Sequence, residues 1–214
     1  MDGSRELNQG GGDLQVVEIR HRLANCFQLL NGLIHARLAH TADGESRRQL
    51  AWLQDVVVSM GILQQRLAAA GNAGFQAYLA EAAELWRRLT VERDIKIELE
   101  TEDIEVAPAK AAPLSLILHE LMTNCCEHAF PKEGGGTVRI AFRHAADACA
   151  ELAVSDDGVG LPPREQIRPS FGLSVVGGLA AQLGGRFSVG SNSPGAIARV
   201  EFPLSETTEA GSMS

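Results

Sequence analysis

The chain has 214 residues, 45% of them hydrophobic, and a formal net charge of -8 at pH 7. This length allows one large domain or two small ones with a buried core. The acidic balance argues against nucleic acid or an anionic membrane surface as the main partner, because both bind surfaces rich in Lys and Arg.

Neither a signal peptide nor a membrane span is predicted. Residues 1–13 are polar and glycine-rich, which indicates a flexible segment, and no apolar run approaches the ~20 residues that a membrane helix needs. Cys26, Cys125, Cys126 and Cys149 lack the spacing of a zinc site or a disulfide framework, so reduced thiols are expected. We expect a cytoplasmic protein that receives any signal through another protein, a small ligand or a further domain.

Two amphipathic helices of similar length are predicted next, over residues 14–40 and 45–70. Apolar residues recur along both at spacings of three and four. They are Val16, Ile19, Leu23, Phe27, Leu30, Ile34 and Leu38, then Leu50, Leu53, Val57, Met60, Ile62, Leu63 and Leu67. The break at 41–44 predicts an antiparallel helical hairpin over residues 14–72. Two helices leave much apolar surface wet, so the hairpin is expected to dimerise into a four-helix bundle or to pack on the rest of the chain.

A second domain is predicted over residues 73–205, because the glycines at 71 and 74 indicate a helix stop and the pattern then changes. The expected helices are 75–89, 113–130 (with Pro113 in the first turn) and 171–183, which Gly184 and Gly185 end. The expected strands are 95–100, 104–106, 137–143, 148–154, 186–189 and 196–203. This order predicts a sheet with helices on one face, an α+β sandwich, followed by a disordered tail over 206–214.

The most informative stretch follows the predicted strand at 148–154 and has the sequence SDDGVGLP. A carboxylate at a strand end can accept a hydrogen bond from an exocyclic amine such as that of adenine. Glycines such as Gly158 and Gly160 let the backbone approach a flat base or a phosphate. Asp156 is therefore the candidate adenine contact, with a plain glycine-rich turn as the alternative.

The helix at 113–130 carries Glu120, Asn124 and His128 four residues apart, on one face. An Asn carbonyl oxygen can help to hold Mg2+ whose other positions are filled by triphosphate oxygens and water, so Asn124 is the candidate metal ligand. A solvated polar face is the alternative. The sequence SFGLS at 170–174 opens the next helix and offers backbone N–H groups to phosphate oxygens.

His21 lies on the first predicted helix. On a helical wheel it is roughly 200° from both Ile19 and Leu23, so it points away from the apolar stripe. A core histidine is therefore disfavoured, and an ordinary surface histidine and a functional one remain as alternatives.

Together these segments resemble the histidine kinases of the HWE and related HisKA_2 type, within the GHKL ATPase superfamily, from about Leu14 to Leu204. The sequence HRLAN at 21–25 resembles the family's phosphoacceptor box, and HELMTN at 119–124 with HAFP at 128–131 resembles its N box. DDGVG at 156–160 resembles the G1 box, and FGL at 171–173 with LAAQLGG at 179–185 resembles the G2 region. Each motif alone is weak, but four in the expected order make a specific match.

The resemblance implies a fold and an activity. The fold is an all-α helical hairpin for dimerisation and histidine phosphotransfer (DHp), followed by an α+β ATPase sandwich of the GHKL, or Bergerat, type. The activity is autophosphorylation of His21 with ATP and Mg2+, and then transfer of the phosphoryl group to an aspartate of a response-regulator receiver domain. Expected partners are that domain, a second copy bound through the hairpin and an upstream sensor protein, with neither nucleic acid nor a membrane.

The resemblance also implies residue roles. Nucleotide contacts are expected from Asn124, His128, Asp156, Gly158, Gly160, Phe171, Gly172 and Leu173, with Asn124 also on Mg2+. The nucleophile must be an unprotonated imidazole nitrogen, which His21 supplies near neutral pH. From its spacing alone, Glu18, one turn before His21 on the same face, is the candidate to orient the His21 ring or to accept its proton.

Some positions depart from the family pattern. Glu127 puts a negative charge where relatives carry Lys or another basic residue. His119 replaces the first Asn of most N boxes, as in HWE kinases. The tryptophan-containing G1 feature of strict HWE proteins is absent, which favours the HisKA_2 type.

Two alternative functions remain. One is a histidine phosphotransferase or pseudokinase adaptor that binds a receiver domain. The other is an anti-sigma-type serine kinase or a GHKL ATPase, in which Glu120 activates water.

Overall fold

The computed structural model describes residues 26–44, 46–47, 49–51, 53–54, 56–58, 60–61, 74–131, 134–161 and 171–205. Several predicted features lie outside these ranges: His21 and Glu18, the segment 1–13, the boundary at 71–73 and the tail from 206. The side chain of Phe171 is also outside the description.

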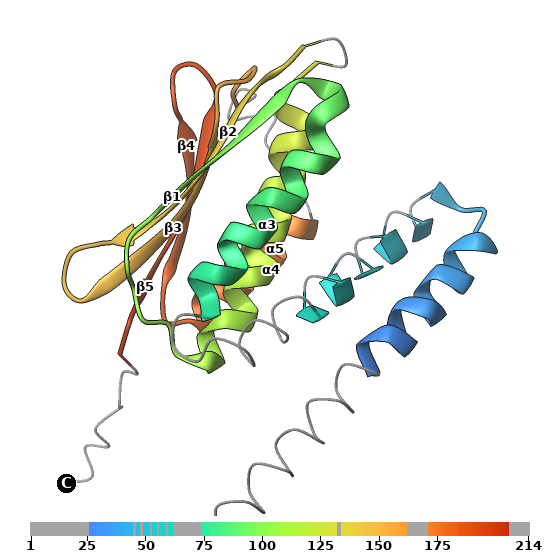
Figure 1. Ribbon diagram of the computed structural model, residues 1–214, viewed down its shortest axis with the longest axis horizontal. Coiled ribbons are helices and arrows are strands. Elements are labelled where there is room, and N and C mark those ends of the chain that lie inside the picture. Colours follow the sequence, from blue (N-terminus) through green and yellow to red (C-terminus); the bar gives the residue numbers. More distant parts are fainter. Residues whose placement is uncertain are drawn as a thin grey trace, which may run out of the picture.

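The N-terminal part is a helical hairpin, as predicted (Figure 1). The first helix covers residues 26–39, and the described residues from 44 to 61 are helical. Asp43 caps the second helix, because its Oδ2 accepts the Ser46 N–H at 2.7 Å. Gln54 Nε2 donates to Asn31 Oδ1 at 3.1 Å and so joins the two helices.

A five-stranded sheet forms the second part, in the order β1-β2-β3-β5-β4. The strands are β1 Ile95–Thr101, β2 Gly136–His144, β3 Cys149–Asp156, β4 Arg186–Ser191 and β5 Ala196–Pro203. β1 is parallel to β2, and the other neighbours are antiparallel. The helices α3 Gly74–Thr90, α4 Pro108–Asn124 and α5 Phe171–Gln182 cover one face (Figure 1). The predicted α+β sandwich is confirmed.

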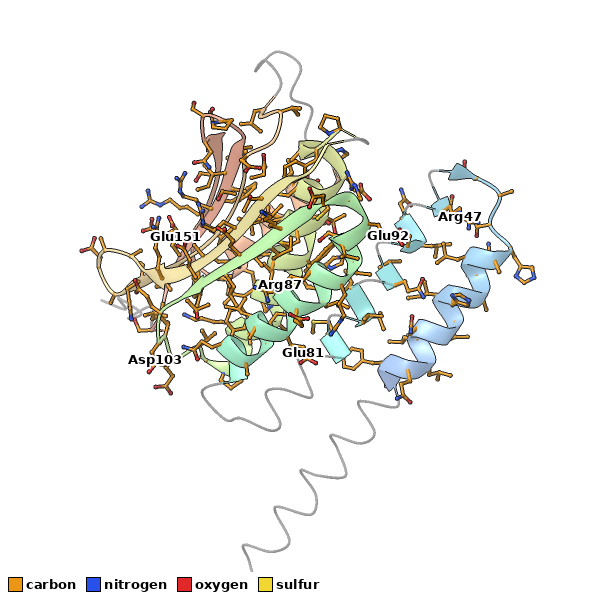
Figure 2. The ribbon with its side chains drawn as sticks, turned by 45° about the horizontal axis from the view of Figure 1, so that its top comes forward. Arg47, Glu81, Arg87, Glu92, Asp103 and Glu151 are labelled. Atoms are coloured by element: carbon orange, nitrogen blue, oxygen red, sulfur yellow. The ribbon has the colours of Figure 1, made fainter. Side chains whose placement is uncertain are left out.

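The core lies between the sheet and its three helices. Phe142 of β2 is completely buried, with the Phe75 ring of α3 edge-on at 5.3 Å and the Phe202 ring of β5 stacked at 6.4 Å. Arg87 also ties α3 to the sheet, since its Nε donates to the Ile97 carbonyl at 2.9 Å (Figure 2). The helix at 74–90 is therefore part of the sandwich core.

The other face of the sheet is charged. Arg139 of β2 pairs with Glu98 of β1 at 2.8 Å, and Arg143 of β2 pairs with Glu151 of β3 at 2.7 Å. The Arg139–Glu98 pair is exposed and contributes little to stability, whereas the Glu151 side chain is only 13% exposed. One apolar and one charged face explain the alternating pattern that made the strands predictable.

The structure corrects two expectations. α4 begins at Pro108, which occupies its first turn, and Pro113 lies inside the helix. Residues 104–106 are not a strand, although Ile104 and Val106 are buried. The Gln76 side chain donates to the carbonyls of Glu102 and Ile104 at 3.2 Å each, so this backbone is satisfied without a neighbouring strand.

The end of α5 agrees with its predicted glycine stop. Gly184 has a φ of 69° and donates to the Ala181 carbonyl, and Gly185 donates to the Ala180 carbonyl, both at 2.9 Å. These are the two bonds of a Schellman motif. Within the described part of the chain, no helix is long and apolar enough to cross a bilayer.

Candidate functional site

Asp156 stands where β3 ends, on the side of the sheet that the helices cover. Leu152, Val154 and Asp156 are all buried and follow each other at the strand period of two, so their side chains share a face. Asp156 lies opposite Val138 of β2. An ionisable carboxylate thus ends a row of core side chains, close to α4.

Three elements hold the Asp156 carboxylate. Oδ1 accepts the N–H of Gly158 at 3.0 Å and the N–H of Ala196, the first residue of β5, at 3.2 Å. Oδ2 accepts the thiol of Cys125, directly after α4, at 3.6 Å. Asp156 is only 6% exposed, and these bonds offset the cost of burying its charge.

The loop after Asp156 packs closely on the segment that follows α4. The Val159 N–H donates to the Ala129 carbonyl at 2.9 Å, and a Cβ at position 158 would lie 2.1 Å from the same oxygen. Gly160 has a φ of 76°, which favours glycine. The sequence suggested that these glycines admit a base or phosphate; in the structure, the missing side chain of Gly158 makes room for the protein's own backbone.

α4 continues into a π-helical turn, η4, over Cys125–Ala129. Arg93 donates to the carbonyls of Cys126 and Phe130, the latter at 3.3 Å, and so satisfies acceptors at the end of this turn. The first residue of the turn contacts Asp156 and the last contacts the loop at 158–159. The turn therefore joins both ends of this loop to α4.

Glu120 and Asn124 form a second group, next to the start of α5. Asn124 Nδ2 donates to the Glu120 backbone carbonyl at 2.8 Å and to its Oε1 at 3.3 Å. A Cβ at position 172 would lie 1.5 Å from Glu120 Oε1, so only glycine fits there while the carboxylate keeps its place. Glu120 is buried at 7% exposure, and the alternative of a simply solvated polar face is wrong for this residue. A negative charge at the first turn of a helix is favourable.

The two groups meet along α4, because Asn124 and Cys125 are consecutive. Asp156, Gly158, Asn124, Glu120 and Gly172 are thereby brought to one end of the sandwich. Leu173 follows Gly172 on α5 and is half-buried.

His128 is less closely joined to this arrangement than predicted. It lies on η4 rather than on α4, and its side chain is exposed. The charged Glu127 beside it is also exposed. Among the described residues, His128 makes no hydrogen bond to Asn124 or Asp156.

His119 packs between helices. Its ring lies 5.8 Å from the Trp86 ring of α3. Burial lowers the pKa of His119 to about 4, so the ring is neutral at physiological pH. His119, the first residue of the segment that resembles the N box, therefore packs α4 against α3.

Sequence reasoning missed two residues that contact Asp156, Cys125 and Ala196. Cys125 follows Asn124 directly, and from the sequence it was expected only to be a reduced thiol. Ala196 contributes a backbone N–H, which any residue except proline provides, so its identity carried no signal. The expectation of reduced cysteines agrees with the four free thiols.

Two family models match the chain in the order that the motifs suggest. A model described as "Histidine kinase", HisKA_2, matches residues 18–89. A model described as "Histidine kinase-, DNA gyrase B-, and HSP90-like ATPase", HATPase_c, matches residues 109–206. The first contains position 21, and the second contains the described groups around Asn124 and Asp156.

Individual proteins agree with these models. Blue-light-activated histidine kinase 2 of Erythrobacter litoralis is 26% identical over 206 residues, which cover 91% of this chain and 58% of that protein. Sensor histidine kinase PdtaS of Mycobacterium tuberculosis is 29% identical over 183 residues, 81% of this chain and 36% of that protein. The chain therefore spans about a third to three fifths of the length of these curated relatives.

A solved structure shares the fold. The histidine kinase domain from the Erythrobacter litoralis EL346 blue-light-activated histidine kinase superimposes with a TM-score of 0.67, at 21% sequence identity, covering 87% of this chain and 94% of that one. Together the two family models cover most of the sequence: residues 18–89 belong to the HisKA_2 histidine kinase family, and residues 109–206 belong to the family of histidine kinase-, DNA gyrase B- and HSP90-like ATPases.

Proposed function

We propose that this chain is an ATP-dependent protein-histidine kinase of a two-component system. It would phosphorylate itself on His21 and pass the phosphoryl group to an aspartate of a response-regulator receiver domain, in the cytoplasm. The observation that carries the proposal is the meeting of Asp156, Asn124 and Gly172 around the end of α4, in a chain whose preceding segment matches the HisKA_2 family around position 21.

Asp156 is proposed to recognise adenine. A carboxylate has about four lone-pair positions, and three of those on Asp156 are used by Gly158, Ala196 and Cys125. The remaining position can accept the exocyclic amine of the base. Gly160 and the loop around it would border the base.

Asn124 fits the part of a Mg2+ ligand. Its Nδ2 is committed to Glu120, which leaves Oδ1 as an oxygen donor of the kind that Mg2+ prefers. Mg2+ held together with the triphosphate would neutralise charge on the phosphate oxygens. Glu120 positions Asn124, and the backbone of Phe171, Gly172 and Leu173 would border the phosphates, with exposed His128 at the rim.

His21 is the proposed nucleophile. An unprotonated imidazole nitrogen forms a bond to the γ-phosphorus while the bond from that phosphorus to the bridging oxygen of ADP breaks. The ring then loses the proton on its other nitrogen to solvent or to a base, and Glu18, one turn earlier in the predicted helix, is the proposed base or orienting group. The hairpin over 14–72 and the catalytic domain over 73–205 would act as separate bodies in this step.

A homodimer through the hairpin is part of the proposal. Several large apolar side chains of the hairpin are exposed in the single chain: Leu29, Leu30, Leu33, Leu53 and Val58. Burying such a surface against a second copy would complete a four-helix bundle. A receiver domain, and an upstream sensor protein, would be further partners.

Incubation with γ-labelled ATP and Mg2+ tests the kinase. The expected result is protein-bound label that is lost in acid and stable in base, and that is absent from His21→Ala. His35→Gln is the matched control, because His35 is an exposed histidine of the same predicted helix. Label that persists in His21→Ala, or that is stable to acid, would reject His21 as the acceptor and favour the serine-kinase alternative. Nucleotide binding with no label in any variant would favour the ATPase, and the absence of nucleotide binding would favour the adaptor.

A further inference from the structure

Cys125 is a residue to which the proposed mechanism gives no task, yet it contacts the proposed adenine-binding group. Its thiol donates to Asp156 Oδ2 at 3.6 Å, from the first residue of η4. The neighbouring Cys126 is buried and has no such contact within the described residues. Of these two adjacent cysteines, Cys125 alone has a described hydrogen bond to Asp156.

The thiol completes the orientation of the carboxylate. The two N–H groups at Oδ1 come from the loop and from β5, and both hold the same oxygen. Oδ2 is held only by the thiol among the described contacts. Without this donor, two lone-pair positions of Oδ2 would be open, and water would compete for the direction that a base amine needs.

The contact has the geometry of a hydrogen bond from sulfur. The Cys125 sulfur and Asp156 Oδ2 are 3.6 Å apart, a separation expected for the larger sulfur atom. A thiol is a weak hydrogen-bond donor and a carboxylate is an acceptor, so the contact is attractive.

We propose that Cys125 is a positioning residue for base recognition: its thiol fixes Asp156 Oδ2 so that one lone pair of that oxygen faces the 6-amino group of a bound adenine nucleotide. The proposal rests on the proposed function, because it takes Asp156 as the adenine contact. The proposal assigns part of the selectivity for a 6-aminopurine to the Cys125 side chain on η4, which does not itself touch the base.

The test compares two ligands in the intact chain. The dissociation constant of ADP with Mg2+ is measured by calorimetry, beside that of purine riboside 5′-diphosphate, which lacks the 6-amino group. Cys125→Ala should weaken ADP binding about fivefold, the effect of one modest hydrogen bond, and leave the analogue nearly unchanged. Cys125→Ser keeps a donor and should restore most of the ADP affinity. Cys126→Ala is the control for removing an adjacent sulfur and should affect neither ligand selectively.

The outcomes separate this proposal from the function on which it rests. If the unaltered chain binds ADP better than the analogue and Cys125→Ala keeps that ratio, or binds ADP more tightly, the positioning role is wrong and the kinase proposal stands. If Cys125→Ala weakens both ligands equally, the residue is only structural and the proposal is again wrong. If the unaltered chain binds neither ligand, the nucleotide site and the role of Cys125 fail together.

Discussion

The sandwich and the hairpin are built from similarly apolar helices but differ in how far one chain can bury them. In the sandwich, Phe142 and Leu114 are fully buried between sheet and helices. In the hairpin, Leu29 is 65% exposed and Leu33 is 59% exposed. The hairpin touches the sandwich through Met60, whose sulfur accepts the Ser115 hydroxyl at 3.7 Å. Two layers complete a core, whereas two helices leave apolar surface for a partner.

This difference separates the two proposed tasks. The proposed nucleotide contacts are held by bonds within the sandwich. The proposed acceptor helix belongs to the part whose apolar surface is incomplete, so its stability should depend on what binds it.

A core truncation should affect the sandwich alone. Phe142→Ala is expected to lower its free energy of unfolding by about 3–5 kcal/mol, because the ring is buried between Phe75 and Phe202. Leu33→Ala in the hairpin should change it by less than about 0.5 kcal/mol. Urea denaturation followed by Trp86 fluorescence, in a Trp52→Phe background, measures both. Similar losses from the two substitutions would mean that hairpin and sandwich unfold as one unit.

Acid should destabilise the sandwich through His119. Its pKa is about 4 in the folded chain and near 6.5 when unfolded, so the unfolded state binds more protons below pH 6.5. Stability attributable to this ring should therefore fall between pH 6.5 and 4, by about 3 kcal/mol in total.

Replacement of the ring identifies this contribution. His119→Gln should flatten the pH dependence of the unfolding free energy, followed with the same tryptophan. At pH 7.5 both states of the original chain hold the neutral ring, so the difference there measures packing alone. An unchanged acid slope in the variant would assign the acid sensitivity to other groups.

Two glycines should respond to alanine in opposite ways. Gly158→Ala places a methyl group 2.1 Å from the Ala129 carbonyl and should cost about 1–3 kcal/mol. Gly178→Ala, on an exposed position of α5 with nothing within 4 Å, should stabilise by about 0.5–1 kcal/mol. Thermal unfolding compares them. A neutral Gly158→Ala would show that the loop shifts away from η4 without loss, against the close packing described here.

The sequence predicted most of the sandwich, because its strands alternate between a charged and an apolar face. The prediction from the sequence failed where a side chain, rather than a neighbouring strand, forms the hydrogen bonds to the backbone. Ile104 and Val106 alternate like a strand, but the Gln76 side chain satisfies the backbone there, and such a distant contact has no local signal. The start of α4 was misplaced because Pro108 and Pro113 both fit a first turn and only tertiary packing selects between them.

The sequence indicated which residues to consider for the candidate site, but it did not predict the contacts between them. Asp156, Asn124 and Gly172 were candidates from the sequence. In the structure, Asp156 contacts Cys125, and both Asn124 and Gly172 lie against Glu120. The burial of Glu120 against Gly172 could not be predicted, because it depends on how α5 meets α4. The π-helical turn was also missed, since the residues 125–129 read as a continuation of an α-helix. His21 and Glu18 stay predictions.

The π-helical turn makes this end of the chain sensitive to insertions and deletions. Removing one residue between Cys125 and Ala129 would let the segment wind as an ordinary α-helix, with better backbone geometry. Every later residue would then rotate by about 100° around the helix axis, and the anchors at 125 and 129 could no longer both reach the strand end and its loop. Sequence length, as much as side-chain identity, is under constraint in these five positions.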